Sequence, residues 1–281
     1  MEYLKKDEVI DILKKRFDDS NRNDYDAIPW IMIHVLRLLK DQFNAVEKVD
    51  YVSVDRMIEA TDRYINGESL SDIFGDIEFY GRKFKTCKGV FDPKLSSEAL
   101  INAVVKNVEP DDDLNVLDLC CGTGCITITL EKILKCNLYG VDISDKALNV
   151  SRKNALILDS NAHFSKMDIL DDWDKFIGIP LNCIVSNPPY WSSKKIFSET
   201  NIQKINSNPI EAFDGGEDGL KYLREIINNA PKYLLPKGML FLEIDDDQEE
   251  NIKKLLEKEF YNIQTEKDYR GITRVIYGTK K

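Results

Sequence analysis

Hydrophobic and polar residues recur with one period in the first quarter of the chain and with another period in the rest. In 2–17 the apolar residues return every three or four positions, which is the spacing of an amphipathic helix. A second helix is expected around Pro29, which suits a first helical turn, and a third from an N-cap at Ser53 to a stop at Gly67. Residues 1–75 are therefore predicted to form a small helical domain, which could be a scaffold or a docking surface for a macromolecular substrate.

The period changes after this domain. Residues 76–90 alternate and turn at Gly81-Arg82, which predicts a β-hairpin linker. Over 91–281, short β-forming runs alternate with helical stretches, which is typical of a mostly parallel sheet with helices on both faces. The expected strands are 114–119, 138–142, 162–168, 182–186 and 238–244, followed by two strands around a turn at Arg270-Gly271. The expected helices are 125–135, 144–158 and 220–235.

The composition is that of a folded globular protein, and it narrows the classes of partner. Of 281 residues, 43% are hydrophobic and 31% are charged. The net charge of −10 argues against a protein that grips long nucleic acid, which normally needs a basic surface. No apolar run could serve as a secretory signal or a membrane span. We therefore expect a cytoplasmic protein with reduced thiols, no membrane contact and no direct contact with nucleic acid.

The cysteines and histidines do not have the spacing of a metal site. Cys121 and Cys125 lie close together, but His34 and His163 are both far from them in the sequence. A zinc site needs four ligands at close spacings. We therefore expect no bound metal, and we expect both histidines to be structural.

The segment 116–126, VLDLCCGTGCI, has the pattern of a strand, a glycine-containing turn and the start of a helix. Gly122 and Gly124 permit backbone conformations and close approaches that a Cβ would prevent. Asp142 ends the next strand, where its carboxylate could accept both hydroxyls of a ribose. The third glycine of a dinucleotide fingerprint is missing, so the pattern favours S-adenosylmethionine, which has no pyrophosphate, over NAD.

The segment KMDI at 166–169 ends the following strand and offers contacts for an adenine. Asp168 could accept a hydrogen bond from the adenine amino group, and Ile169 could lie against the ring. Acidic residues commonly end strands, so the value of this segment comes from its position one strand beyond Asp142.

The segment NPPY, residues 187–190, ends the fourth strand of the parallel series. Asn187 offers a side-chain carbonyl, and Pro188 offers a backbone carbonyl without an N–H, so the two could accept both hydrogens of a planar –NH2 group. Tyr190 could stack on the face of that group. We expect this clamp to hold an amide or aromatic-amine nitrogen in line with a sulfonium methyl group.

Together these segments resemble the HemK/PrmC family of protein-glutamine N5-methyltransferases, which act on peptide chain release factors. The resemblance covers nearly the whole chain and includes GESLSDIFGDIEFYGRKF, FDPKLSSE, VLDLCCGTGCI, GVDISDKAL, IVSNPPY, GGEDGL and LEIDDDQ. It implies a class I, Rossmann-like methyltransferase fold behind a helical substrate-docking domain, and N5-methylation of the glutamine in a Gly-Gly-Gln motif. By this likeness the substrate amide would be bound by Asn187, Pro188, Pro189 and Tyr190. The cofactor would be bound by Cys120, Cys121, Gly122, Thr123, Gly124, Asp142, Asp168, Ile169 and Asn187.

Some positions depart from the family's pattern. Cys120 stands where a glycine is usual, and Trp191 follows NPPY where an aliphatic residue is common. Lys94 replaces an arginine, Ser96 an aspartate, and Asp245 a glycine. A lysine keeps the charge of an arginine but loses its two-pronged geometry. We expect these changes to leave the chemistry intact and to affect the details of the peptide-binding loop.

Two acidic segments have simple structural interpretations. GGEDGL at 215–220 is predicted to be a helix-start turn rather than a phosphate loop, because Glu217 and Asp218 would repel a phosphate. DDDQEEN at 245–251 is predicted to be a solvated helix cap, where the helix dipole favours acids.

The sequence therefore predicts a monomeric enzyme that methylates the glutamine amide of a class I release factor. Two other possibilities stay open. An amino-group methyltransferase acting on a nucleic-acid base would share the clamp, and Lys194 and Lys195 follow the motif. A non-catalytic, methyltransferase-like partner protein would share the fold but would not bind the cofactor.

Overall fold

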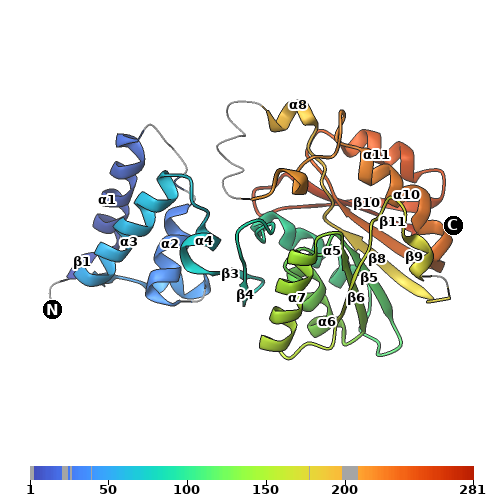
Figure 1. Ribbon diagram of the computed structural model, residues 1–281, viewed down its shortest axis with the longest axis horizontal. Coiled ribbons are helices and arrows are strands. Elements are labelled where there is room, and N and C mark those ends of the chain that lie inside the picture. The colour runs from blue at the N-terminus through green and yellow to red at the C-terminus, as the bar shows by residue number, and fades with distance from the viewer. Residues whose placement is uncertain (1–2, 21–24, 26, 39, 177, 198–207) are drawn as a thin grey trace. The chain divides into compact units, whose positions relative to one another are not determined.

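The structure is a computed structural model in which the chain divides into two compact units, residues 1–88 and 89–281 (Figure 1). The residues that it describes are 3–20, 25, 27–38, 40–176, 178–197 and 208–281. None of the helices in these ranges combines the length and the apolar character that a membrane crossing requires.

The first unit is a small helical bundle with its own hydrophobic core. Leu13, Phe17, Ile31, Met32 and Met57 are fully buried in this core. Its helices are α1 (Lys6–Asp19), α2 (Ala27–Leu36), η1 (Lys40–Ala45), α3 (Tyr51–Ile65) and α4 (Leu70–Phe74). Its strands are β1 (Tyr3–Lys5), β2 (Lys48–Asp50), β3 (Asp76–Phe79) and β4 (Arg82–Lys85). The predicted helices are present, and Pro29 lies in the first turn of α2 as expected.

Three local predictions in this unit were wrong in detail. The first described residues form β1, in which Leu4 pairs with Val49, so α1 begins later than expected. The N-cap of α3 is Asp50, whose carboxylate accepts the Ser53 backbone N–H at 3.0 Å, because an extended Asp50 places its side chain over the first turn. The hairpin turns at Tyr80-Gly81, one residue early, because Arg82 already pairs with Phe79.

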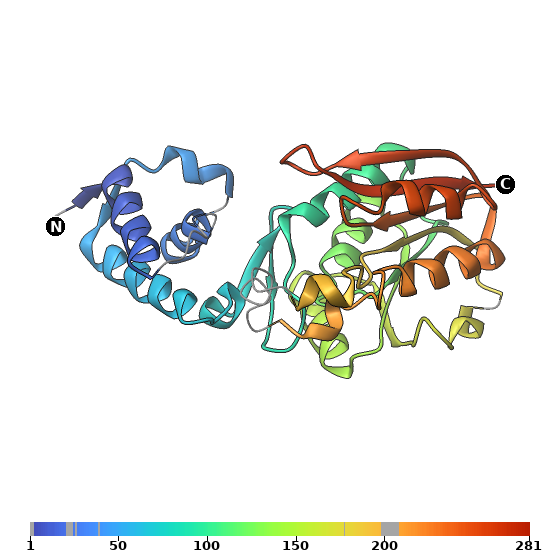
Figure 2. The same ribbon diagram turned by 90° about the horizontal axis from the view of Figure 1, so that it is seen from above.

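The second unit is built on a seven-stranded sheet of order β10-β11-β9-β8-β5-β6-β7. Strand β11 runs in the opposite direction to the other six strands, so it pairs antiparallel with β10 and with β9. Figure 2 shows β10 and β11 in red at one border of the sheet. The parallel strands are β5 (Asn115–Leu119), β6 (Asn137–Asp142), β7 (His163–Lys166), β8 (Leu181–Ser186) and β9 (Leu234–Glu243). The last two strands are β10 (Phe260–Lys267) and β11 (Thr273–Lys280), on either side of the predicted turn. The predicted mostly parallel α/β sheet is confirmed.

Helices cover both faces of this sheet, and the alternation along β5 shows which side chains meet which helices. Leu117 and Leu119 are buried in a core with Leu223 and Ile226 of α10, whereas Asp118 points to the other face and accepts a hydrogen bond from α6. The α-helices of the unit are α5 (Glu98–Asn107), α6 (Cys125–Leu134), α7 (Asp145–Ile157), α8 (Ser193–Ile196), α10 (Lys221–Tyr233) and α11 (Glu249–Leu256). Its 3-10 helices are η2 (Leu95–Ser97), η3 (Trp173–Phe176) and η4 (Ile210–Ala212).

Candidate active site

The strand register gathers the predicted site residues along one edge of the sheet. Leu119 at the end of β5 pairs with Val141 of β6 and with Ser186 of β8, and Ser186 pairs with Leu242 of β9. Parallel sheets bind ligands at the carboxyl ends of their strands. The next residue of each strand therefore lies in one row along the edge where a ligand is expected: Asp142, Cys120, Asn187 and Glu243.

Asp142 is held in place by backbone donors. Its Oδ2 accepts the Gly122 N–H and its Oδ1 accepts the Ser144 N–H, both at 2.9 Å. Burial raises the pKa of Asp142, and these N–H groups oppose that rise. Each carboxylate oxygen keeps a second lone pair, so the residue can still accept the hydroxyls of a ribose.

The loop before α6 contains the conformations that its glycines were predicted to allow. Gly122 has φ 55° and open space where a Cβ would lie, whereas a Cβ on Gly124 would meet Ser151 at 3.0 Å and Phe164 at 3.1 Å. Gly124 is therefore required by packing. Cys120 also has a positive φ, 61°, which disfavours any residue with a Cβ and explains why a glycine is usual there.

The rest of the loop is buried and tied to neighbouring elements. The Cys121 N–H donates to the Val141 carbonyl at 2.9 Å, and the Thr123 carbonyl accepts the Asn154 side chain at 2.9 Å. Burial raises the pKa of Cys121 well above its ordinary value, so its thiol stays protonated. This loop can shape a pocket but offers no nucleophile.

The buried carboxyl of Asp118, at the end of the strand before this loop, is a candidate partner for a positively charged group of a ligand. Its Oδ2 accepts the Thr127 hydroxyl at 2.5 Å, but its Oδ1 is buried and has no hydrogen-bond partner among the described residues. Burial raises the pKa of Asp118 to about 7, and Thr127 opposes that rise. A nearby ammonium group would favour the carboxylate, as the methionine end of S-adenosylmethionine would provide. Together, the carboxylates of Asp118 and Asp142 offer acceptors that fit the ammonium and ribose groups of the cofactor.

Asp168 and Ile169 follow β7 at the same edge. Asp168 Oδ1 accepts the Leu170 N–H at 2.9 Å, which fixes the carboxylate in a tight turn. The Ile169 side chain is only 6% exposed, because it packs in the hydrophobic core with Trp173. It thus offers little apolar surface to a ligand, and the adenine contacts of both residues stay predictions.

The clamp residue Asn187 has its amide nitrogen engaged on the protein side. Asn187 Nδ2 donates to the Ser97 hydroxyl oxygen at 3.1 Å, which leaves Oδ1 as an acceptor. Pro188 is buried, Pro189 is half-buried, and neither has an N–H. The segment therefore presents acceptors and no backbone donor at its centre, which suits a substrate that carries an –NH2 group.

The hydroxyl of Tyr190 is hydrogen-bonded to a buried carboxyl group. This hydroxyl donates to Glu243 Oε1 at 3.0 Å, and Glu243 is only 1% exposed. Burial raises the pKa of Tyr190 well above its ordinary value, and the Glu243 charge raises it further. Burial likewise raises the pKa of Glu243 to about 7, against the opposing effects of Ser97, Arg274 and Tyr190. The ring is thus fixed by its hydroxyl and cannot act as a base at neutral pH.

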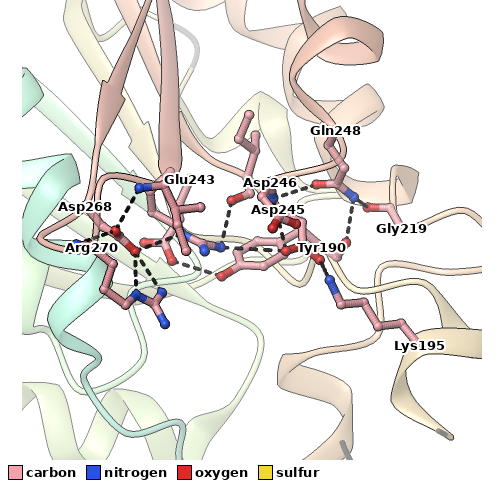
Figure 3. A network of polar contacts seen from close by, with 12 residues as sticks. Tyr190, Lys195, Gly219, Glu243, Asp245, Asp246, Gln248, Asp268 and Arg270 are labelled. Atoms are coloured by element: carbon pink, nitrogen blue, oxygen red, sulfur yellow. Dashed lines mark hydrogen bonds and ion pairs between the residues drawn. The ribbon is translucent and has the colours of Figure 1, made fainter.

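The backbone of the clamp is braced by Gln248, as Figure 3 shows. Gln248 Nε2 donates to the Tyr190 carbonyl at 2.7 Å and to the Gly219 carbonyl at 3.3 Å, while its Oε1 accepts the Asp245 N–H at 3.0 Å. A Cβ on Gly219 would lie 2.5 Å from the Tyr190 carbonyl oxygen. GGEDGL does precede a helix, α10, as predicted, but it also packs directly against the clamp.

The prediction that 245–251 is a solvated cap was wrong for its first residue. Asp245 is 5% exposed and forms an ion pair with Lys195 (Figure 3). The Arg274 Nη1 lies 3.8 Å from its Oδ1. The carboxylates of Asp245, Asp246 and Asp247 are close enough to one another to hold a cation. However, Asp245 already has two cationic partners, so the departure from glycine at this position is explained by its ion pair with Lys195 of α8, the short helix after NPPY.

An aromatic cluster forms the wall beside the clamp. The Trp191 ring lies 5.0 Å from that of Phe213, which lies 5.2 Å from that of Phe91. Lys94 Nζ lies 5.2 Å above the Phe91 ring. Burial lowers the pKa of Lys94, and Asp92 opposes that change. Trp191 and Lys94, two of the departures from the family's pattern, therefore belong to one surface.

Both histidines have structural surroundings. His34 stacks on Phe74 with 4.6 Å between ring centroids, and its Nε2 lies 2.9 Å from the Asp76 carbonyl oxygen. His163 stacks on Tyr139 at 5.8 Å.

Sequence reasoning assigned no role to several residues that support the clamp. The segments FDPKLSSE and LEIDDDQ are family-like, but their residues do not by themselves point to a ligand. The alternation of side chains along β9 could have indicated one of them. It places Glu243 on the face of the sheet opposite the core residue Leu242. The missed residues are Ser97, Glu243, Gln248 and Arg274.

Comparisons with known proteins agree with this geometry. The family model described as "Methyltransferase small domain" matches residues 81–208. The release factor glutamine methyltransferase of Thermodesulfovibrio yellowstonii is 33% identical over 252 residues, which cover 88% of this chain and 89% of that protein. The release factor glutamine methyltransferase of Bacillus cereus is 30% identical, over 93% of this chain and 94% of that protein.

Solved structures share the fold at lower identity. A methyltransferase from Pyrococcus furiosus superposes with a TM-score of 0.56 at 14% identity, over 79% of this chain and 98% of that chain. The T. thermophilus 16S rRNA N2 G1207 methyltransferase, solved with AdoMet and guanosine, has a TM-score of 0.51 at 20% identity, over 73% of this chain and 50% of that chain. These likenesses confirm the class I methyltransferase fold. From its relatives, the chain belongs to the release factor glutamine methyltransferase family.

Proposed function

We propose that this chain transfers a methyl group from S-adenosylmethionine to the side-chain amide nitrogen of a glutamine in a class I peptide chain release factor, within its Gly-Gly-Gln motif. The observation that carries the proposal is the orientation of Asn187. Its nitrogen is engaged by Ser97, so its oxygen is directed to an incoming –NH2 group beside the Pro188 carbonyl. The family of the chain supports the choice of a glutamine amide over other amines.

An amide nitrogen is a poor nucleophile because its lone pair is delocalised into the carbonyl. Two acceptors on its hydrogens return electron density to the nitrogen, and this effect grows as positive charge develops in the transition state. The Tyr190 ring, fixed by Glu243, limits the nitrogen to one orientation. When bound, the cofactor would supply a sulfonium methyl group. Its S–CH3 bond would break as the new N–C bond forms, which would leave S-adenosylhomocysteine, and the nitrogen would then lose one hydrogen as a proton to water.

The residues proposed to bind the cofactor lie beside the clamp. Asp142 would accept the ribose hydroxyls and Asp118 would face the ammonium group, while Cys120–Gly124 would shape the pocket between them. In the proposal the chain works as a monomer in the cytoplasm, where release factors act.

The test is to incubate the purified protein with labelled S-adenosylmethionine and a class I release factor, and to map the label by peptide mass spectrometry. We expect one added methyl group on the Gly-Gly-Gln glutamine. We expect none when that glutamine is replaced, and a strongly reduced rate when the enzyme carries Asn187→Ala. Transfer to RNA or DNA in a parallel reaction, with none to the release factor, would instead establish a nucleic-acid base as the substrate. Failure to bind the cofactor would establish a non-catalytic role.

A further inference from the structure

The backbone that carries Tyr190 is joined to a second segment, residues 213–219. The Trp191 N–H donates to the Phe213 carbonyl at 2.8 Å, and the Trp191 carbonyl accepts the Gly215 N–H at 2.8 Å. At Gly219 the two segments approach so closely that a Cβ would lie 2.5 Å from the Tyr190 carbonyl oxygen. The position of the clamp at Tyr190 therefore depends on what holds these two segments together.

The side-chain amide of Gln248 lies where the two segments meet (Figure 3). Its Nε2 donates to the Tyr190 carbonyl at 2.7 Å and to the Gly219 carbonyl at 3.3 Å, while its Oε1 accepts the Asp245 N–H at 3.0 Å. Only one orientation of the amide satisfies these contacts, because a carbonyl can only accept and a backbone N–H can only donate. Both hydrogens of the amide are thus used to join the clamp to the second segment.

Gln248 can hold these segments because its own position is fixed. It is the N-cap of α11, where its N–H donates to the Asp245 carbonyl at 3.1 Å and its carbonyl accepts the Ile252 N–H at 3.0 Å. Ile252 is fully buried in the hydrophobic core with Leu223 of α10 and Leu242 of β9. The Gln248 residue is only 6% exposed, so water has little access to replace its contacts. The amide therefore connects the clamp to the rigid part of the unit.

We propose that Gln248 is a positioning residue for methyl transfer, which holds the backbone of the clamp in its productive place. Tyr190 is then fixed at both ends, its hydroxyl by Glu243 at 3.0 Å and its carbonyl by Gln248 at 2.7 Å. Without the amide, the Tyr190 and Gly219 carbonyl oxygens would face each other with no donor between them, and their repulsion would move the segment. Gln248 acts through Tyr190 and not on the substrate itself, and the inference rests on the proposed function.

An ion pair also holds this part of the chain, and its contribution has to be separated from that of the amide. Lys195 of α8 pairs with the carboxylate of Asp245 (Figure 3). The Lys195 side chain is 32% exposed, so solvent screens the pair. Asp245→Asn removes the charge but keeps the backbone N–H that Gln248 accepts, so kcat should stay within a few fold of the wild type. A loss as large as that of Gln248→Met would assign the positioning to the ion pair and overturn the inference.

The main test compares Gln248→Met and Gln248→Glu with the wild-type chain, using labelled S-adenosylmethionine and a class I release factor. Methionine has a similar length but no donor, and a small misplacement of a reacting group lowers kcat by roughly 10²-fold. Glutamate keeps an acceptor for Asp245 but sets a carboxylate against two carbonyl oxygens, so its loss should be larger. Gln264→Glu, on the exposed face of β10, keeps its acceptor for the Tyr277 hydroxyl and should retain full turnover.

Cofactor binding distinguishes positioning from a general loss of structure. Titration calorimetry of both Gln248 variants should give a stoichiometry and a Kd for S-adenosylmethionine within a few fold of the wild type. A partly unfolded protein would instead lose binding sites in proportion to kcat. Wild-type kcat in Gln248→Met would overturn the inference, and so would equal losses of kcat and cofactor binding.

A matched pair of glycine variants moves the same contact from its other side. Gly219 and Gly271 have nearly equal positive φ angles, 77° and 78°, so alanine introduces the same backbone strain at both. A Cβ on Gly219 would lie 2.7 Å from Gln248 Nε2, whereas a Cβ on Gly271 meets nothing within 4 Å. We expect Gly219→Ala to lose kcat as Gln248→Met does, and Gly271→Ala to stay within a few fold of the wild type. Equal kcat in the two variants would contradict the role of Gln248.

The outcomes also separate this inference from the proposed function. If the wild type is active and Gln248→Met matches it, only the positioning role fails. If the wild type does not methylate the release factor, the proposed function fails, and the same variants are compared on whichever substrate accepts the label. If the chain transfers methyl groups to no substrate, both fail. Should Gln248→Met not fold, as thermal unfolding would show, Gln248→Glu and the glycine pair still decide the matter.

Discussion

The cofactor side and the substrate side of this site are stabilised in different ways. Asp142 is fixed by the backbone N–H groups of Gly122 and Ser144, 20 and 2 positions away in the chain, and the loop before α6 depends on positive φ angles at Cys120, Gly122 and Gly124. Asn187 is fixed by a side chain 90 positions away and Tyr190 by one 53 positions away.

This difference has a consequence for how each half responds to change. A backbone N–H is present whatever the side chain, except in proline, so the cofactor half depends on a few residues whose backbone conformation matters. The clamp depends on side chains from η2, the end of β9 and the segment before α11, and each of these can be altered separately. Substitutions far along the chain are therefore expected to change turnover while leaving cofactor binding unaltered.

The largest effect is expected from Asn187→Ala. It removes the acceptor for the substrate amide, and the loss of one such transition-state contact lowers kcat by roughly 10²–10³-fold. Binding of S-adenosylmethionine, measured by titration calorimetry, should change by less than a few fold. Asn107→Ala, at the C-terminal end of α5, is the matched control and should keep full turnover. Equal losses in kcat and in cofactor affinity would contradict the division of the site into two halves.

Asp142→Asn should give the opposite pattern. Both carboxylate oxygens accept backbone N–H groups, so an amide would place its NH2 against one of them and would also weaken the ribose contact. We expect the Kd for S-adenosylmethionine to rise roughly 10–100-fold, the range for hydrogen bonds to a charged group, with kcat nearly unchanged at saturating cofactor. Asp145→Asn is the control, because that exposed carboxylate pairs only with Lys166 in the described structure. A normal Kd in Asp142→Asn would remove Asp142 from the cofactor site.

Buried carboxyls on both sides of the site make stability depend on pH. The pKa of Asp118 and that of Glu243 are each raised to about 7, from ordinary values of 3.8 and 4.5. Between those ordinary values and about 7 the folded chain binds more protons than the unfolded chain. The free energy of unfolding of the cofactor-free protein should therefore fall as the pH rises from about 5 to 8.

Urea denaturation at several pH values measures this slope, and Asp118→Asn should make it shallower by removing one of the two groups. Asp172→Asn is the control. The Asp168 backbone N–H donates to the Asp172 carboxylate and lowers its pKa, so this group is already ionised across the pH range measured. A stability that rises between about pH 5 and 8 would show that these carboxyls are ionised in the folded protein.

The contrast between the two halves also explains how much the sequence could predict. The parallel sheet, the loop at 120–124 and the NPPY segment follow from local patterns, since hydrophobic period, glycine and proline act over a few residues. Ser97 and Glu243 could not be placed, because an ordinary serine and glutamate gain their role only when the fold brings η2 and the end of β9 to Asn187 and Tyr190. Asp245 was misjudged for the same reason: its partner Lys195 lies 50 positions away.

The smallest effect tests the claim that the cofactor half depends on backbone shape. Cys120 has φ 61°, and a left-handed conformation disfavours an L-residue by about 1–2 kcal/mol. Cys120→Gly relieves this strain but increases the freedom of the unfolded chain and removes some packing, so we expect a net gain in stability of about 0.5 kcal/mol. Cofactor affinity and kcat should stay within twofold of the wild type.

Gly124→Ala is the matched opposite of Cys120→Gly. Its φ is also positive, at 78°, but its Cβ would collide with Ser151 and Phe164. We expect it to destabilise the fold by about 2 kcal/mol or more, since strain and overpacking add, and to weaken cofactor binding as the loop shifts. Urea midpoints of the two variants, measured side by side, give the comparison. If Cys120→Gly destabilised the chain as much as Gly124→Ala, packing rather than backbone conformation would govern position 120, and the loop would depend on side chains just as the clamp does.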